Sequence, residues 1–435
     1  MGNYRWRIVA ILFFATTVNY IDRQVLSFTM TDEIFRKEML GIPLDVSLTQ
    51  VDIDRFKVQY GDIDAAFKFM YALGFLVIGW LIDKIGTKKG FSLGITIWSI
   101  AGILTTFVGS MRGLGLARGL LGIGEAANFP SSIKTVSEWF PKRERSFANG
   151  VFNAGSNVGI IITAIGVPWM ILNYGWRSSF FITGMLGFVL LGFWWLMYSR
   201  PETNPKVSEA ELAYILSDQE ETTKPKISWL KLLTYKQTWA FAVGKFMADP
   251  IWWFYMTWLP DFFNSNEALD QKLDLKSFGI PFLIIYVISD AGSVFFGWLS
   301  TQFMTRFGWT ANRARKTTML ICALCVVPIS FAAKTNSLSV AIALIALATS
   351  AHQGWSANMY TFASDLFPKN VVASVTGIGG MAGATAGILF ALMAGRIIVS
   401  FGYIPMFIIA SCSYLVALLI IHLILPNLEP IQIEE

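Results

Sequence analysis

The sequence predicts an all-α membrane protein in which twelve transmembrane helices form two six-helix repeats. Three observations support this fold class. Of the 435 residues, 54% are hydrophobic and only 14% are charged, whereas about a quarter of the residues in a soluble domain are charged. Apolar runs long enough to cross about 30 Å of hydrocarbon recur along the chain. In addition, the second half of the chain repeats short motifs of the first half.

Six apolar spans precede a polar central segment, and six follow it. The first span has no small-residue cleavage site after its apolar core, so it predicts a membrane-spanning helix and not a signal peptide. The run FFITGMLGFVLLGFWWLMY and the run MFIIASCSYLVALLIIHLIL are typical later spans. We expect the spans at residues 6–31, 62–84, 90–110, 113–137, 145–171, 176–199, 238–264, 276–303, 316–334, 337–364, 370–396 and 402–425.

The central segment is polar and rich in charged residues and proline. It predicts a linker at residues 200–237, which separates an N-terminal half at 1–199 from a C-terminal half at 238–435. Within it, Ser208 and Glu211 have the spacing of a capping box and predict one short helix. Lys and Arg are more frequent in the loops on the side of this linker and the termini. The positive-inside rule therefore puts both termini in the cytoplasm.

Two motifs occur once in each half. GWLIDKIGTKKG at 79–90 recurs loosely as GWLSTQFMTRFGW at 297–309, and WFPKRERSFANGV at 139–151 recurs as LFPKNVVASVTGI at 366–378. Parallel six-helix repeats are typical of transporters, in which the substrate site lies between the repeats near the middle of the bilayer.

The first of these motifs, GWLIDKIGTKK, resembles the loop signature of the major facilitator superfamily. Within it, the chain is similar to the anion:cation symporters and in particular to the hexuronate transporters. The resemblance extends over almost the whole chain and is carried by NYIDRQVLS at 19–27, RGLLGIGEAANFP at 118–130, NAGSNVG at 153–159, ADPIWWFYMTWLP at 248–260 and HQGWSANMYTFASDLFPK at 352–369.

The resemblance implies the major facilitator fold in a bacterial inner membrane. It also implies a conformational latch on the cytoplasmic side, in which Asp83 faces the start of a neighbouring helix. The latch would consist of Gly79, Asp83, Gly86, Lys88 and Lys89. The chain departs from the family in its long acidic first external loop at 32–61, for which the sequence indicates no role.

Ionisable side chains inside a membrane span are costly unless they are paired or hydrated, so each is a candidate functional residue. Asp22 and Arg23 lie in the first span, and Arg118 and Glu125 lie two turns apart on one face of the fourth. A desolvated carboxylate that loses an arginine partner can take up a proton. The resemblance implies that Asp22 and Glu125 carry protons, that Arg118 is their partner, and that Arg23 contacts the substrate carboxylate. A salt-bridge cluster that only locks helices together is the alternative.

Polar and aromatic side chains in other spans suit a polyhydroxylated anion. The resemblance makes Tyr71 a sugar-acid contact. Lys68 is either a second anion contact or the partner of Asp64 one turn away. Lys245 and Asp249 are predicted to pair, next to a proline that bends the helix. The further candidate substrate contacts are Asn153, Ser156, Asn157, Asp249, Trp252, Tyr255, Gln353, Trp355, Asn358 and Tyr360.

The sequence contains no Walker loop, no H-E-x-x-H motif and no cluster of metal ligands, so we expect neither an enzyme nor a metal or cofactor site. The basic residues lie in loops between spans, which argues against nucleic-acid binding. The predicted function is proton symport of a hexuronate, such as galacturonate or glucuronate, into the cytoplasm by alternating access. The lipid bilayer is the other expected partner, and a monomer is sufficient. The alternatives are another organic-acid anion such as an aldonate, sodium coupling, or a membrane sensor that binds without transport.

Overall fold

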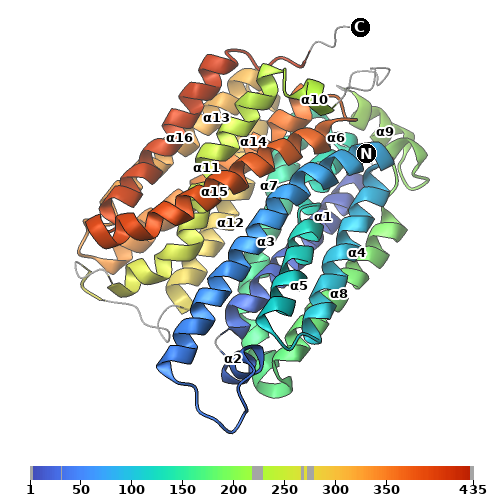
Figure 1. The fold of residues 1–435 in the computed structure, drawn as a ribbon. Coiled ribbons are helices and arrows are strands. Elements are labelled where there is room, and N and C mark those ends of the chain that lie inside the picture. The colour runs from blue at the N-terminus through green and yellow to red at the C-terminus, as the bar shows by residue number, and fades with distance from the viewer. Residues whose placement is uncertain (1–2, 31, 218–228, 266–268, 272–278, 432–435) are drawn as a thin grey trace.

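The computed structural model describes residues 3–30, 32–217, 229–265, 269–271 and 279–431. Within these residues the chain is helical and forms no β-strand. Long helices form one bundle, and both termini lie at the same end of it (Figure 1). We call this the terminal end, because α1 begins and α16 ends there; the opposite end, which carries α2, is the distal end.

The N-terminal half provides six spans, and one of them is interrupted. Its helices are α1 (Tyr4–Thr29), α3 (Gln50–Ile85), α4 (Thr87–Thr106), α5 (Met111–Glu125) with α6 (Asn128–Trp139), α7 (Lys142–Tyr174) and α8 (Trp176–Met197). The predicted span 113–137 is broken by a turn at Ala126 and Ala127, so Glu125 is the last residue of α5. Helix α1 packs against α7, α3 against α5, and α4 against α8.

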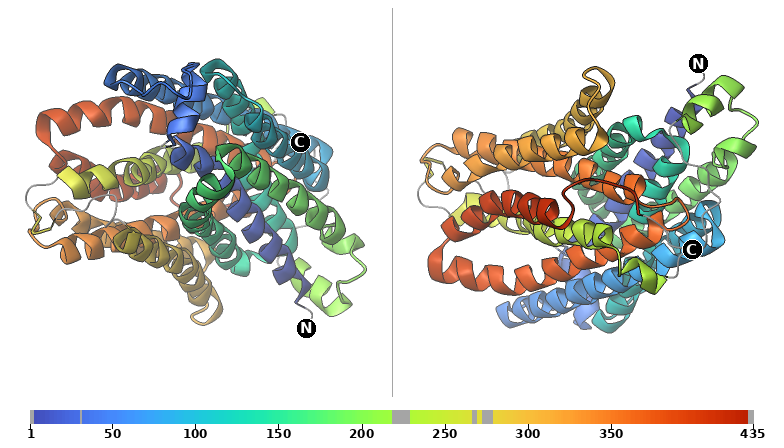
Figure 2. Two further views of the ribbon diagram at one scale, coloured as in Figure 1. Left: turned by 90° about the horizontal axis from the view of Figure 1, so that it is seen from below. Right: turned by 90° about the horizontal axis from the view of Figure 1, so that it is seen from above.

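The C-terminal half repeats this arrangement. Its helices are α11 (Lys236–Ser265), α12 (Gly279–Thr305), α13 (Ala311–Val326) with the 3₁₀-helix η2 (Val327–Phe331), α14 (Leu338–Leu366), α15 (Val372–Phe401) and α16 (Ile404–Ile424). Viewed from either end, the two halves lie side by side (Figure 2). Of the twelve spans in the described residues, eight are long and apolar enough to cross a membrane by length and composition.

The halves meet along two seams. Helix α3 packs against α15, and α7 packs against α12 and α14. The first seam depends on Gly79, because a Cβ atom there would lie 2.6 Å from the carbonyl oxygen of Ala373. A side chain at this position would therefore push the two halves apart.

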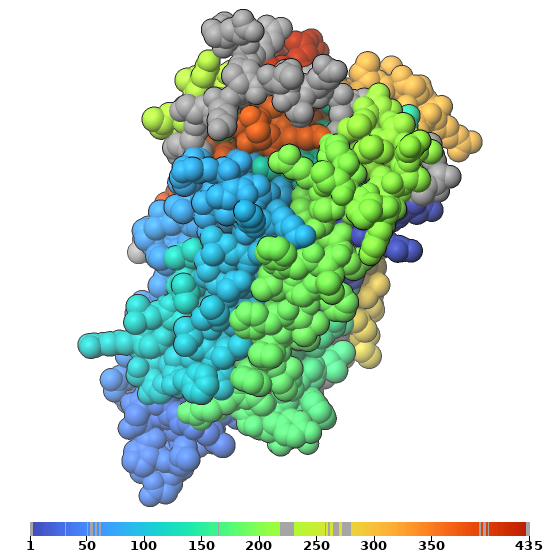
Figure 3. All heavy atoms as spheres, turned by 90° about the vertical axis from the view of Figure 1, so that its right-hand side faces the viewer, coloured from blue at the N-terminus to red at the C-terminus, as the bar shows by residue number. Residues whose placement is uncertain are grey.

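Helices α4 and α8 form an outer face of the N-terminal half (Figure 3). Their exposed side chains are large and apolar, with Leu104 46%, Phe193 48% and Leu196 79% exposed. Such a continuous apolar surface is not stable in water and is suited to contact with lipid chains.

Short helices cover the terminal end of the N-terminal half: η1 (Pro201–Thr203) and α9 (Glu209–Leu216), while α10 (Trp229–Leu232) leads into α11. The Ser208 hydroxyl accepts a hydrogen bond from the Glu211 amide, 3.2 Å away, and starts α9 as the sequence predicts. The Glu211 carboxylate does not complete the predicted capping box. It accepts hydrogen bonds from the amides of Tyr4 and Arg5, each 3.1 Å long. Residues 218–228 of the predicted linker lie outside the described residues.

The acidic segment at 32–61 contains the helix α2 (Glu33–Leu40) and the first turns of α3. Phe35 of α2 is fully buried and packs edge-on against Phe56 and Trp176, with ring centroids 6.1 and 4.9 Å away. An ion pair of 2.6 Å between Arg177 and Glu38 adds to this contact. We call α2 with these partners the distal cap; its apolar cluster draws only on residues of the N-terminal half.

Candidate substrate site

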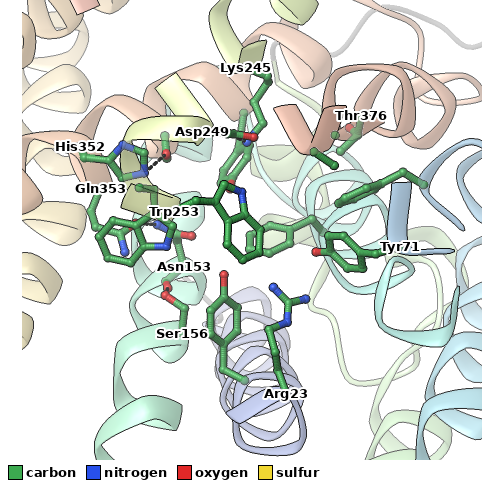
Figure 4. A pocket seen from close by; sticks show the side chains of 18 of the residues that line it. Arg23, Tyr71, Asn153, Ser156, Lys245, Asp249, Trp253, His352, Gln353 and Thr376 are labelled. Atoms are coloured by element: carbon green, nitrogen blue, oxygen red, sulfur yellow. Dashed lines mark hydrogen bonds and ion pairs between the residues drawn. The ribbon is translucent and has the colours of Figure 1, made fainter. Parts of the chain in front are cut away.

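A cavity lies between the halves, and side chains of both halves line it (Figure 4). It contains about 690 Å³ of space outside the protein atoms, open solvent included. The N-terminal half contributes Tyr20, Arg23, Tyr71, Phe75, Phe129, Asn153 and Ser156 to its wall. The C-terminal half contributes Phe241, Lys245, Asp249, Trp252, Trp253, His352, Gln353, Ser356, Tyr360, Thr376, Gly380 and Ala384.

Arg23 is the cation of the N-terminal wall. Its Nε donates to the Glu125 carboxylate over 2.8 Å, and Glu125 itself is fully buried behind the wall. The guanidinium group also lies over the rings of Tyr20 and Tyr71, at 4.8 and 4.6 Å from their centroids. Its Nη2 has no hydrogen-bond partner among the described residues. A donor is therefore available for an acceptor that enters the cavity.

Arg118 of α5 contacts the backbone of α1 next to this pair. Its guanidinium group donates to the carbonyl oxygens of Arg23, at 2.9 Å, and of Asp22, at 3.4 Å. Asp22 is buried and is not part of the cavity wall, and neither of its carboxylate oxygens has a hydrogen-bond partner in the described part of the chain. The structure thus gathers all four predicted charges but pairs Glu125 with Arg23, whereas the expected partner Arg118 binds backbone carbonyls.

Lys245 and Asp249 are the charged groups of the opposite wall. They lie one turn apart on α11, and their ion pair measures 2.9 Å. The Lys245 ammonium group also lies 5.0 Å from the ring centroid of Tyr360.

Aromatic rings shape the same wall. Trp252 stacks on His352, with a centroid distance of 4.9 Å and an interplanar angle of 6°. The His352 Nδ1 atom is hydrogen-bonded to the Tyr414 hydroxyl over 2.6 Å, which fixes the imidazole in place. Together with Trp253 these rings offer flat apolar surfaces to a ligand.

Amide groups from the two halves meet at the cavity wall. The Asn153 side chain donates to the Gln353 amide oxygen over 2.6 Å and to the Ser293 hydroxyl over 3.2 Å. Amide and hydroxyl groups that already bridge the halves are well placed to exchange these bonds for bonds to a polar ligand.

Comparisons with known proteins identify the family. The family model of the Major Facilitator Superfamily matches residues 12–391. The chain belongs to the major facilitator superfamily. It is 30% identical to the hexuronate transporter of Escherichia coli K12, over 99% of this chain and 96% of the relative. It is 30% identical to the galacturonate transporter of Dickeya chrysanthemi, over 74% and 89%, and 26% identical to a probable galactarate/D-glucarate transporter of E. coli, over 99% and 97%.

Solved structures share the fold of this major facilitator at low sequence identity. The proton:xylose symporter XylE superposes with a TM-score of 0.73 at 15% identity, over 98% of this chain and 97% of that one. The E. coli fucose:proton symporter FucP gives a TM-score of 0.71 at 12% identity, over 97% and 99%. The family model and the curated relatives together make the chain a multi-pass bacterial inner-membrane transporter and not an enzyme.

The predicted latch residues of this major facilitator lie at the terminal end. Asp83 accepts hydrogen bonds from the amides of Ser374 and Ala373, at 2.7 and 3.4 Å, and forms an ion pair of 2.6 Å with Lys134. These amides belong to the first turn of α15, where the helix dipole favours an anion. Gly86 makes the turn between α3 and α4 with a φ of 89°.

Within the described residues, the two lysines of the predicted latch make no hydrogen bond or ion pair with the other half. Lys88 donates to the carbonyl oxygen of Trp195 in α8, at 3.0 Å, and Lys89 is exposed. A separate bridge crosses between the halves, since Arg145 of α7 pairs with Asp365 of α14 at 3.0 Å.

Five of the candidate substrate contacts lie outside the wall of the cavity: Lys68, Asn157, Tyr255, Trp355 and Asn358. Lys68 is paired with Asp64 at 2.8 Å, one of the two arrangements left open by the sequence. Asn358 donates to the carbonyl oxygen of Gly354 and accepts from Ser146 across the seam.

Several wall residues were not among the candidates, and their sequence signal is uneven. Lys245 and His352 are ionisable groups inside spans, so the same physical rule that selected Asp249 could have selected them. Asp290 of α12 is another ionisable group inside a span, but it lies outside the cavity wall: it accepts a hydrogen bond of 2.8 Å from Asn157 beside an apolar groove. Tyr20 and Thr376 carry no such signal.

Proposed function

We propose that this transporter imports a hexuronate, such as galacturonate or glucuronate, together with protons. The observation that carries the proposal is the ion pair between Arg23 and Glu125, because it joins a cation of the cavity wall to a fully buried carboxylate. The names of the hexuronate and galacturonate relatives support the substrate class.

The wall around Arg23 suits a sugar acid. A guanidinium group binds a carboxylate through two parallel hydrogen bonds, and the flanking rings of Tyr20 and Tyr71 restrict its orientation. Across the cavity, the Trp252 and Trp253 rings offer apolar surfaces for the C–H faces of a sugar. Asn153, Ser156, Gln353 and Tyr360 provide donors and acceptors for its hydroxyl groups.

Proton coupling follows from competition for one guanidinium group. When the substrate carboxylate binds Arg23, Glu125 loses part of its counter-charge while it remains buried. A buried carboxylate without a partner is strongly disfavoured, so proton uptake by Glu125 lets the substrate bind. Asp22, also buried and without a hydrogen-bond partner among the described residues, is the second proton acceptor, and the nearby Arg118 stabilises its ionised form.

The charge of the substrate makes a coupling cation necessary. An unaccompanied monoanion that enters a cell moves against the membrane potential, which costs about 2.3 kcal/mol per charge per 100 mV. One proton per monoanion makes the transfer electroneutral, and a second proton adds a driving force.

The closed terminal end represents one state of the alternating-access cycle. With both termini in the cytoplasm, as the positive-inside rule predicts, the contacts of Asp83 and Arg145 would shut the cytoplasmic exit. The halves at 1–199 and 238–435 would then rock about the cavity, and the linker at 200–237 would connect them. A monomer contains every part that this cycle needs.

The decisive experiment measures uptake of labelled galacturonate into proteoliposomes under an imposed pH gradient. Glu125→Gln is expected to retain counterflow, because the amide keeps the shape of the carboxyl group, and to lose pH-driven accumulation. Glu138→Gln, which changes a buried glutamate at the terminal end outside the cavity wall, serves as the matched control and should still accumulate substrate. Accumulation by Glu125→Gln at the wild-type level would contradict the proton role.

Three further arms separate the alternatives. Accumulation driven by a sodium gradient at equal pH would indicate sodium coupling. Stronger competition by galactonate than by galacturonate would indicate an aldonate carrier. Binding of galacturonate without counterflow would indicate a sensor.

A further inference from the structure

The charges on the cavity wall are unequal in the two halves. With histidine neutral, three side chains of the wall carry a formal charge: Arg23 on one side, and Lys245 and Asp249 on the other. Lys245 is neutralised by Asp249 within the wall, whereas the partner of Arg23 lies behind the wall. The cavity therefore presents one cation that a ligand can neutralise.

The pair between Lys245 and Asp249 is held on both sides. One oxygen of Asp249 accepts from Lys245 at 2.9 Å. Its other oxygen faces α15 so closely that a Cβ atom on Gly383 would lie 2.0 Å from it. The Lys245 ammonium group rests against the Tyr360 ring. Because both side chains are confined, the pair cannot readily separate to free the lysine for an incoming anion.

From this geometry we infer that the pair of Lys245 and Asp249 sets the charge of the substrate, by accepting a hydroxyl-bearing end and rejecting a second carboxylate. The inference rests on the proposed function, in which a sugar acid binds Arg23 through its carboxylate. The far end of a hexuronate carries hydroxyl groups, which can accept a hydrogen bond from Lys245 and donate one to Asp249. An adjacent ammonium and carboxylate thus match the acceptor oxygen and the donor O–H of a hydroxyl group.

An aldarate, in which both ends are carboxylates, meets this wall differently. Its second carboxylate would lie beside Asp249, and like charges forced together in a desolvated site oppose binding. Lys245 cannot fully neutralise the second carboxylate of the ligand, because it is already paired with Asp249. The side chains of the pair, 12% and 18% exposed, are also poorly screened by water. The pair therefore acts as a repulsive element against diacids.

Galactarate and galacturonate provide the test: the far end is a second carboxylate in galactarate and the ring-forming C1 in galacturonate, so the change of their affinity ratio in a charge variant reports the effect of charge apart from that of the ring. Binding of each to the purified full-length protein is measured by calorimetry at neutral pH. We expect the wild type to bind galacturonate at least about tenfold more tightly than galactarate. Asp249→Asn should reduce this ratio by about tenfold or more, mainly through tighter galactarate binding.

Two further variants make the result interpretable. Asp290→Asn removes a membrane carboxylate of the same half outside the cavity wall and should leave the ratio unchanged. Lys245→Gln leaves Asp249 without its cation and should weaken galactarate further, a result that does not depend on Asp249→Asn folding. A wild type that binds both acids equally, or an unchanged ratio in Asp249→Asn, overturns the inference alone. Failure to bind either acid overturns the proposed function and this inference with it.

Discussion

Arg23 makes several contacts at once: it donates to Glu125, and its guanidinium group lies between the rings of Tyr20 and Tyr71. A planar group held in this way keeps its donors aimed at the cavity before any ligand arrives. Pre-organisation of this kind reduces the entropy that binding must overcome. The identity of the cation should therefore matter as much as its charge.

Arg23→Lys tests this expectation. An ammonium group keeps the charge but offers neither the planar pair of donors nor the same stacking on tyrosine rings. We expect galacturonate affinity, measured by calorimetry, to fall by about tenfold to a hundredfold. Arg177→Lys, at an exposed ion pair of the distal cap, is the control and should bind like the wild type. Equal affinity in the Arg23 variant would show that charge alone attracts the substrate.

Single residues show where sequence reasoning succeeded and where it could not. Charges inside apolar spans were sufficient to select Arg23, Glu125 and Asp249. Helical spacing put Arg118 and Glu125 on one face, but the ion pair of Glu125 comes from Arg23 on another helix. Which helices lie side by side, and at what depth, is a property of tertiary packing that the spacing within one helix does not contain.

At the scale of elements, the short linker helix α9 is attached to the start of α1. The Glu211 carboxylate is buried and accepts from two backbone amides of α1 and from the Arg5 side chain, at 3.3 Å. The first amides of a helix lack partners within the helix, and an anion next to them is favourable. Helix α9 therefore holds α1 at the terminal end.

Removal of this carboxylate should destabilise the protein. Glu211→Ala leaves two amides and a buried arginine with fewer partners, which costs about 3 kcal/mol. The temperature of thermal unfolding in detergent should fall measurably. Glu209→Ala changes an exposed glutamate in the first turn of the same helix and should unfold near the wild-type temperature. Equal stability of both variants would mean that α9 does not hold α1.

Element boundaries were predictable where one physical signal dominated. Apolar length located the spans, and Ser208 marked the start of α9. The break between α5 and α6 was missed, because Ala126 and Ala127 both favour a helix; its sequence signal is Pro130, which has no N–H to donate to the carbonyl oxygen of Ala126. Helix α2 was missed as well, since the acidic composition of its segment concealed the contact of Phe35 with Trp176.

At the scale of the whole molecule, we propose that the contact of Asp83 with the start of α15 helps to hold the terminal end closed. A carboxylate at a helix N-terminus gains both hydrogen bonds and the favourable dipole. In the proposed alternating-access cycle this contact breaks when the terminal end opens, so its strength would contribute to the balance between the two states.

Asp83→Asn should shift that balance toward opening at the terminal end. The amide loses the charge that attracts both the helix start and Lys134. Spin labels at Lys84 and Arg306, in a background without the three native cysteines, report the separation of the halves. We expect a larger fraction of long distances. Asp64→Asn, in the distal half of the same helix α3 and away from the terminal end, is the control. An unchanged distance distribution in Asp83→Asn would assign the closure to other contacts, such as the bridge between Arg145 and Asp365.

The fold class was accessible from composition, twelve spans and internal repeats, because each reflects a constraint that the bilayer imposes on every helix. The sequence did not predict which end of the bundle is closed. A protein that alternates between two arrangements uses one sequence for both, and their free energies differ by only a few kcal/mol.

In the part of the chain that the structure describes, the apolar cluster of the distal cap draws only on the N-terminal half. A nanobody raised against α2 should therefore move with the N-terminal half as one rigid body and leave the transport rate unchanged. In cryo-electron microscopy the bound nanobody would serve as a fiducial: it would orient each particle image and reveal the tilt of the N-terminal half relative to the C-terminal half.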